Sequence, residues 1–295
     1  MNNNIPKYAR HIAFLLIVAG SFSSCEKEDM SPEKFRLVKV LYYERSADTQ
    51  PKDGVEYTYD SAGNMVKESF FDYKANTVYR YREFEYSGNK KIKMKVFNEA
   101  DNFEMSRYID YIYDNDRLIT EEINNGAGLF LCSMNYEYIG GNMVREYYFE
   151  PDYGISDEVI YSFDSQNRLI LEEYETSKVT DNKYIKHIFD SNDRKGKLEY
   201  YNLNWELIKT VEMIYNGRSK LPVKDIHYDK NGVQTAEYQH YYDKRGNLTE
   251  TRLVDGCSLF KRRIDGGLLI EEILYAVGKP GCPEDETARY IYEKQ

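Results

Sequence analysis

The chain has 295 residues, a formal net charge of −10, four histidines and four cysteines. This acidic balance disfavours nucleic-acid binding, because the phosphate backbone attracts clustered cations, and the basic runs are confined to Lys90-Lys91 and Lys261-Arg262-Arg263. The few histidines and cysteines lack ligand spacings such as His-Glu-x-x-His or Cys-x-x-Cys, so the sequence predicts no metal site and no cofactor.

Residues 1–24 have the layout of a secretory signal peptide. Lys7 and Arg10 precede an apolar run, residues 12–20, that is too short to cross a bilayer. The run ends in Phe22-Ser23-Ser24-Cys25, which resembles a lipobox, the site at which bacterial lipoproteins are cleaved and acylated on the cysteine. We therefore expect lipidation at Cys25 and a tether over residues 25–34. The alternative is an ordinary signal peptide with an incidental cysteine.

The residues after Cys25 suggest a location. An acidic run, Glu26-Lys27-Glu28-Asp29, follows directly, and similar runs mark some lipoproteins for the outer face of the outer membrane. We expect an outer-membrane lipoprotein that faces the cell exterior, with the periplasmic face as the alternative. Removing residues 1–24 takes away Lys7 and Arg10, so 40 − 2 = 38 basic residues remain against 50 acidic ones, a balance of −12. That charge disfavours attraction to anionic lipid, so membrane attachment would come from the acyl chains.

An aromatic residue closes one predicted β-strand at regular intervals along residues 35–252. The steps between these anchors are 27, 27, 25, 25, 26, 26 and 27 residues, so one unit of about 26 residues is repeated. The anchors are Tyr59, Tyr86, Tyr113, Tyr138, Phe163, Phe189, Tyr215 and Tyr242. Turn residues follow several of them, as in Asp60-Ser61-Ala62-Gly63-Asn64, and aspartate, glycine and asparagine are typical of tight turns.

The repeat predicts an all-β protein. A unit of this length holds two strands of roughly eight residues and two turns, and no long segment past the signal region keeps a helical apolar period. A twisted open sheet usually carries no more than roughly ten strands before it curls or splits. We therefore expect a long antiparallel meander of hairpins in a curled or rolled sheet. The alternative is a β-propeller, in which two units form one four-stranded blade.

One domain, residues 35–295, accounts for the whole repeat array, because no Pro/Gly/Ser-rich linker divides it. The pattern loosens from about residue 253, through Asp255-Gly256-Cys257 and Pro280-Gly281-Cys282-Pro283. Terminal units of repeat proteins are commonly atypical because they cover exposed edges. We expect an irregular C-terminal cap there.

The repeat resembles the YD repeats of bacterial Rhs-type proteins, whose core is a Tyr-Asp pair followed by a Gly-Asn turn and a leucine. Four copies keep the pair, at Tyr59-Asp60, Tyr113-Asp114, Tyr228-Asp229 and Tyr242-Asp243, and the resemblance spans roughly residues 50 to 250. Phe163-Asp164 and Phe189-Asp190 replace the tyrosine, whereas Tyr86-Ser87, Tyr138-Ile139 and Tyr215-Asn216 depart from the pair. The resemblance implies strands wound into a large curled sheet, in some members a shell around a toxin domain. No separate toxin domain is left over in this sequence.

Cys257 and Cys282 are candidates for a disulfide in an exported protein. They lie 25 residues apart, about one repeat, so regular strands would separate them by about 9.6 Å, beyond the roughly 7 Å limit for a bridge. A disulfide therefore requires the Gly- and Pro-containing loops to break the repeat, and the sequence leaves both outcomes open.

Aromatic residues are the candidates for ligand contact, since 30 Tyr and 13 Phe cannot all be buried in a thin sheet. Adjacent aromatics point to opposite faces of a strand, which selects Tyr147, Tyr148, Tyr200, Tyr201 and Trp205. We expect a non-catalytic envelope protein that binds a glycan or an envelope protein, or acts as a scaffold, through an aromatic-rich β surface. The alternatives are a polysaccharide hydrolase with two distant carboxylates and a structural or assembly component. No catalytic residue is predicted.

Overall fold

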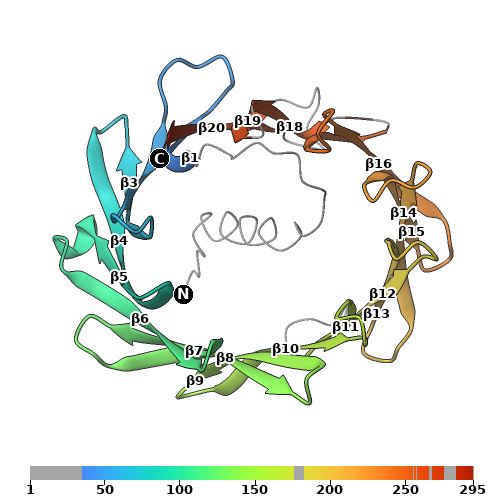
Figure 1. Ribbon diagram of the computed structural model, residues 1–295, viewed down its shortest axis with the longest axis horizontal. Helices are drawn as coiled ribbons and strands as arrows, with labels where there is room; N and C mark the ends of the chain where they lie inside the picture. The colour runs from blue at the N-terminus through green and yellow to red at the C-terminus, as the bar shows by residue number, and fades with distance from the viewer. Residues whose placement is uncertain are drawn as a thin grey trace. The chain divides into compact units, whose positions relative to one another are not determined.

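The computed structural model describes residues 35–175, 183–254, 256, 258–265, 268–275 and 284–294. Cys25, Cys257, Cys282, the signal peptide and the tether lie outside the described residues. Residues Arg36–Glu293 form one compact unit, and its strands belong to a single 20-stranded antiparallel sheet (Figure 1). The strands are β1 Phe35–Tyr43, β2 Asp53–Tyr59, β3 Met65–Asp72, β4 Thr77–Ser87, β5 Lys90–Asn98, β6 Met105–Asp114, β7 Arg117–Asn125, β8 Phe130–Ile139, β9 Met143–Glu150, β10 Gly154–Phe163, β11 Leu169–Tyr174, β12 Tyr184–Phe189, β13 Lys195–Tyr201, β14 Leu207–Tyr215, β15 Pro222–Asp229, β16 Gln234–Tyr242, β17 Leu248–Leu253, β18 Ser258–Asp265, β19 Leu268–Tyr275 and β20 Glu284–Lys294, with a short 3-10 helix, η1, at Glu99–Asp101.

The sheet is closed. Each strand pairs with the next along the chain, and β1 also pairs with β20, so the last strand returns to the first. Figure 1 follows this order from blue β1 to red β20. The predicted open meander in a curled or rolled sheet is therefore wrong, and so is the β-propeller alternative. Closure removes both free edges of the sheet, which would otherwise present unpaired backbone groups. Strands β18 to β20 continue the sheet through the segment expected to form an irregular cap.

Side-chain contacts reinforce the seam between the two ends of the chain. The Arg289 guanidinium on β20 donates to the carboxylate of Glu271 at 2.9 Å and to the carbonyl oxygen of Ser46 at 2.6 Å. Its carbon Cζ lies 4.2 Å from the ring centre of Tyr43 on β1. Arg289 therefore connects β19, β20 and the β1–β2 loop.

Each anchor tyrosine fixes the start of the preceding strand. Its hydroxyl donates a hydrogen bond to a backbone carbonyl 20 to 22 residues earlier, so the phenol replaces water at a strand end. The pairs are Tyr59 with Leu37, Tyr86 with Met65, Tyr113 with Lys91, Tyr138 with Leu118, Tyr215 with Lys195 and Tyr242 with Pro222. The two phenylalanine anchors lack the hydroxyl, and Arg168 lies over the ring of Phe189, 4.3 Å from its centre.

Seven turns share one hydrogen-bond pattern. A leading Asp or Asn accepts the backbone N–H groups of the residues two and four positions later, an Asx turn, and the residue three positions later has a positive φ. The leading residues are Asp60, Asn125, Asp164, Asp190, Asn202, Asp229 and Asp243. The turn punctuation predicted from Asp, Asn and Gly is confirmed at these positions.

The turn aspartates make stability depend on acid. Hydrogen bonds from the backbone N–H of Val233, and then from Asn231, hold the pKa of Asp229 below its usual range. A carboxyl whose pKa is lower in the folded than in the unfolded protein stabilises the fold above the unfolded pKa, about 3.9, and loses that contribution as pH falls through the folded pKa. We expect Asp229→Asn to weaken the acid dependence of the denaturation midpoint, because Asn125 and Asn202 make the same turn without titrating. Asp152→Asn, outside the seven turns, is the control. An unchanged acid slope in Asp229→Asn would contradict the argument.

The two faces of the sheet differ. One face, here called the tyrosine face, carries the alternating rings of Tyr57, Tyr111, Tyr136, Tyr161 and Tyr290, and burial raises the pKa of each hydroxyl, that of Tyr161 to about 12. The other, here called the charged face, carries ion pairs between neighbouring strands. They include Lys93–Asp110 at 2.9 Å, Arg145–Glu158 at 2.8 Å and Lys224–Glu237 at 2.6 Å. Such part-exposed pairs each contribute little to stability, about 0–1 kcal/mol, so they do not account for the stability of the sheet.

Candidate functional site

The structure separates the five predicted contact aromatics into three environments. Tyr148 and Tyr200 lie on the tyrosine face, and burial is the main reason that the pKa of each hydroxyl is raised. Tyr147 is half-buried on the charged face, opposite Asn135 of β8. Tyr201 and Trp205 come together at the β13–β14 turn. The candidates therefore do not form one site.

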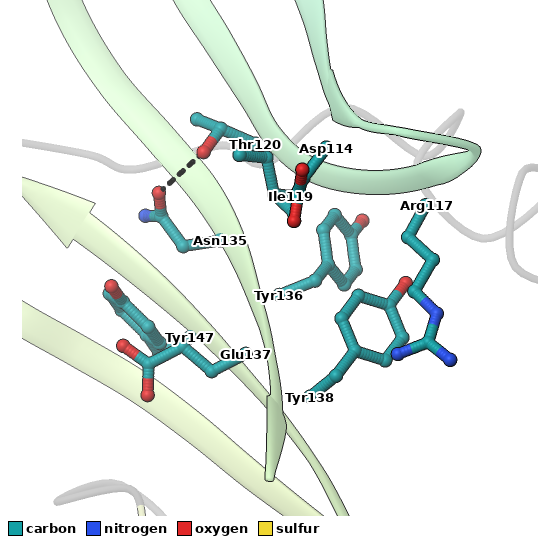
Figure 2. A pocket seen from close by; sticks show the side chains of 9 residues that line it. All are labelled: Asp114, Arg117, Ile119, Thr120, Asn135, Tyr136, Glu137, Tyr138 and Tyr147. Atoms are coloured by element: carbon teal, nitrogen blue, oxygen red, sulfur yellow. Dashed lines mark hydrogen bonds between the residues drawn. The ribbon is translucent and has the colours of Figure 1, made fainter. Parts of the chain in front are cut away.

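Tyr147 lines an open groove of about 500 Å³ over β7, β8 and β9 (Figure 2). Its other lining residues include Tyr138, whose ring lies 5.1 Å from the guanidinium carbon of Arg117. Several polar groups of the groove already have protein partners. Thr120 Oγ1 donates to Asn135 Oδ1 at 3.2 Å, the dashed line in Figure 2, and Glu137 pairs with Arg145 at 3.0 Å. A ligand in this groove would have to replace contacts that already exist.

Trp205 lies at a turn position that glycine occupies in four of the other six turns of this kind. Asn202 Oδ1 accepts the N–H groups of Asn204 at 2.9 Å and Glu206 at 3.0 Å, which makes Trp205 the third residue after the turn's leading residue. Its φ is +60°, in the left-handed region. The equivalent residues of the other six turns are Gly63, Gly128, Asn167, Asp193, Gly232 and Gly246. A bulky side chain there costs on the order of 1 kcal/mol, so the turn itself gives no reason for a tryptophan.

The indole of Trp205 completes an aromatic platform, defined here as Trp205 with Tyr184 and Tyr201. Its ring centre lies 3.9 Å from that of Tyr184, with the planes 14° apart, and 5.7 Å from that of Tyr201. Tyr184 and Tyr201 are direct partners across β12 and β13. Tyr184 is 8% exposed, whereas Trp205 is 51% exposed. One face of the indole is therefore packed, and much of the rest of the ring faces solvent.

Polar groups surround the platform. The Tyr201 hydroxyl donates to Glu199 at 2.6 Å, a hydrogen bond that raises the pKa of Tyr201 to about 12. Burial opposes ionisation of Glu199, but hydrogen bonds from Tyr201 and Lys197 outweigh it and hold the pKa of that carboxyl below its usual range. Asn202 Nδ2 donates to Glu206 at 2.8 Å. A flat apolar ring bordered by carboxylates and amides can stack on a ligand ring and accept hydrogen bonds from its edge.

Sequence reasoning selected Trp205 and Tyr201 but missed Tyr184. An alignment of Asn202–Glu206 on Asp60–Asn64 would have placed Trp205 at the glycine position of the turn. Tyr184 carried no such signal, because its stacking depends on the pairing of β12 with β13 and on the direction of the turn.

No cluster of three or more His, Cys, Asp or Glu side chains that could hold a metal ion occurs among the described residues. Within the same part of the chain, no helix is long and apolar enough to span a membrane. Cys132, on β8, is buried and free.

No protein-family model and no curated protein matches the chain. Among solved structures, it is similar to part of the TcdB2-TccC3-Cdc42 complex, with 16% identity and a TM-score of 0.48, covering 81% of this chain and 13% of that one. A porin-like protein from Bacteroides uniformis is 13% identical with a TM-score of 0.26, over 87% of this chain and 96% of that one, and a porin-like protein from Bacteroides vulgatus is 11% identical with a TM-score of 0.27, over 88% and 99%. At these identities and TM-scores the similarities assign no function, and membership of the YD-repeat family stays a prediction.

Proposed function

We propose that this protein is a non-catalytic, lipid-anchored protein of the cell envelope that binds neutral carbohydrate, with Trp205 as the contact residue. The observation that carries the proposal is the half-exposed indole of Trp205, stacked on Tyr184 at a turn position that favours glycine. Residues held against their local backbone preference cluster at binding and active sites.

The chemistry of the platform favours a sugar ring. A pyranose presents an apolar face of C–H groups and an edge of hydroxyls, and the platform offers an open aromatic face beside the carboxylates of Glu199 and Glu206. The net charge of −10 disfavours anionic polymers. The envelope location rests on the predicted signal peptide and on Cys25, which a lipid-labelling experiment with Cys25→Ala would test.

Trp205 is the single tryptophan of the chain, so its fluorescence reports on the platform directly. We expect laminarin, amylose or mannan to change that fluorescence in a saturable way, and alginate, an anionic polymer, to change it less. Trp205→Gly is expected to reduce the affinity for the responding polymer at least about ten-fold, or about 1.4 kcal/mol, measured by calorimetry.

The same substitution should leave the fold intact. Glycine relieves a backbone strain of about 1 kcal/mol and removes a stacking contact worth about 0.5–1.5 kcal/mol. We therefore expect the free energy of unfolding to change by less than about 1 kcal/mol. Tyr147→Ser, in the groove, is the matched control and should bind as the parent does. Unchanged affinity in Trp205→Gly, or lost affinity in Tyr147→Ser, would contradict the proposal. Release of new reducing ends from the bound polymer would favour the hydrolase instead.

A further inference from the structure

Trp205 is not the only exposed aromatic residue among the turns at its end of the strands. The turns that follow the odd-numbered strands form one rim, here called the aromatic rim. Phe103, between β5 and β6, and Tyr153, between β9 and β10, lie on this rim with Trp205, between β13 and β14. Their exposed fractions are 37%, 79% and 51%. They are 50 and 52 residues apart in sequence, which is two repeat units in each case.

Phe103 repeats the unusual features of Trp205. It has a φ of +58°, again in the left-handed region, and its ring stacks on Tyr81, 5.8 Å between centres and 26° between planes. Tyr81 stacks in turn on Phe97, at 4.5 Å and 14°. The geometry of a strained, exposed aromatic on a strand tyrosine therefore occurs twice on the same rim. Phe103 and Trp205 are the two aromatic members among the seven non-glycine residues of positive φ in the described part of the chain.

The spacing of the three rings is regular. Each is four strands from the next, and neighbouring strands lie about 4.8 Å apart, so about 19 Å of sheet separates successive rings. Carboxylates and amides lie in the same turns, at Glu150 and Asp152 beside Tyr153 and at Asn102 and Glu104 beside Phe103. The rim also exposes Leu129 and Leu203. Its exposed apolar side chains are nevertheless grouped in separate turns that also carry acidic and amide groups, rather than in the continuous desolvated patch of a protein interface. Its acidic groups also disfavour an anionic lipid surface.

We propose that the aromatic rim binds one long, neutral polysaccharide at several points, with Phe103, Tyr153 and Trp205 each stacking on a separate sugar ring of the same chain. This inference rests on the proposed function and names its ligand as a polymer rather than a short oligosaccharide. Once one ring is held, the others bind intramolecularly, and such linkage raises overall affinity by about 10² to 10⁴.

The test compares laminarin, amylose and mannan with their disaccharides, which are too short to contact two rings of the aromatic rim at once. For the polymer that responds, we expect the parent protein to bind it at least about 100-fold more tightly, per binding site, than its disaccharide. Phe103→Asn and Tyr153→Ser should each weaken polymer binding and leave disaccharide binding at Trp205 unchanged. Asparagine suits the backbone at 103, because Asn167 has a similar φ of +62°, so we expect this variant to fold as the parent does.

The outcomes separate the inference from the proposal beneath it. Equal affinity for polymer and disaccharide, both lost in Trp205→Gly and both kept in Phe103→Asn and Tyr153→Ser, overturns the inference and leaves the proposed function standing. Absence of binding to all three polymers and their disaccharides overturns both. Sedimentation with zwitterionic phosphatidylcholine vesicles that depends on the three aromatics, without polymer binding, assigns the rim to a lipid surface and also overturns both.

Discussion

Arg289→Ala is expected to open the seam of the sheet and to lower the free energy of unfolding by about 3 kcal/mol, since hydrogen bonds to charged groups contribute about 1.5–3 kcal/mol each. The variant removes the bonds to Glu271 at 2.9 Å and to the Ser46 carbonyl at 2.6 Å, and the cation over the ring of Tyr43. Glu271 is left with a carboxylate that is 19% exposed and has lost its main partner. Urea denaturation gives the stability change, and hydrogen exchange should show lost protection in β1 and β20 but not in β5 to β8.

Arg263→Ala is the matched control, because Arg263 approaches the same carboxylate, at 3.7 Å, with a side chain that is 62% exposed. An exposed pair contributes about 0–1 kcal/mol, so this variant should remain close to the parent. Equal losses in both variants, or exchange spread evenly over all strands, would mean that Arg289 does not hold the seam.

Local chemistry predicted the parts of this fold that depend on neighbouring residues. The Asp-x-x-Gly-Asn turn at Asp60 works through hydrogen bonds within five residues, so the sequence contains all of its partners. The anchor hydroxyls are one step less local, because Tyr113 reaches Lys91 on the preceding strand. The repeat placed that tyrosine, but not its acceptor.

Closure of the sheet could not be predicted from the local sequence. It joins β1 to β20, and the contact of Arg36 with Glu293 spans 257 residues. Whether an array of strands meets its own start depends on the number of strands and on their twist and tilt, which no single repeat determines. The loosened pattern after residue 253 suggested a cap, whereas β18 to β20 pair in order up to the seam.

The candidate site likewise has features that the local sequence predicts and features that it does not. Tyr200 and Tyr201 lie on opposite faces because they are consecutive residues of β13, but spacing did not distinguish rings that pack from rings that face solvent. The backbone strain at Trp205, with a φ of +60°, is recognised only when its turn is compared with the six others, because the residue type alone does not indicate the backbone conformation.

Gly126→Ala is expected to be the most damaging single-methyl change in the β7–β8 turn. A Cβ on Gly126 would lie 1.7 Å from the carbonyl oxygen of Met105 and 2.9 Å from its carbon, both backbone atoms that cannot rotate away. Overpacking typically costs about 1–3 kcal/mol, and we expect the upper end because the Gly126 N–H also donates to the Ser106 carbonyl at 2.9 Å. In Gly128→Ala, in the same turn, the new Cβ would lie 3.6 Å from the Tyr108 hydroxyl, its one close neighbour. We expect this variant to lower the free energy of unfolding by about 1 kcal/mol, because alanine disfavours the φ of +88°.

The two variants should also differ in binding. Since Met105 follows Phe103 by two residues, the shift forced by Gly126→Ala should weaken polysaccharide binding at the aromatic rim, whereas Gly128→Ala should leave it intact. Denaturation and calorimetry on the two variants measure both effects, and equal stability in the two would show that the turn can move away from Met105 at little cost.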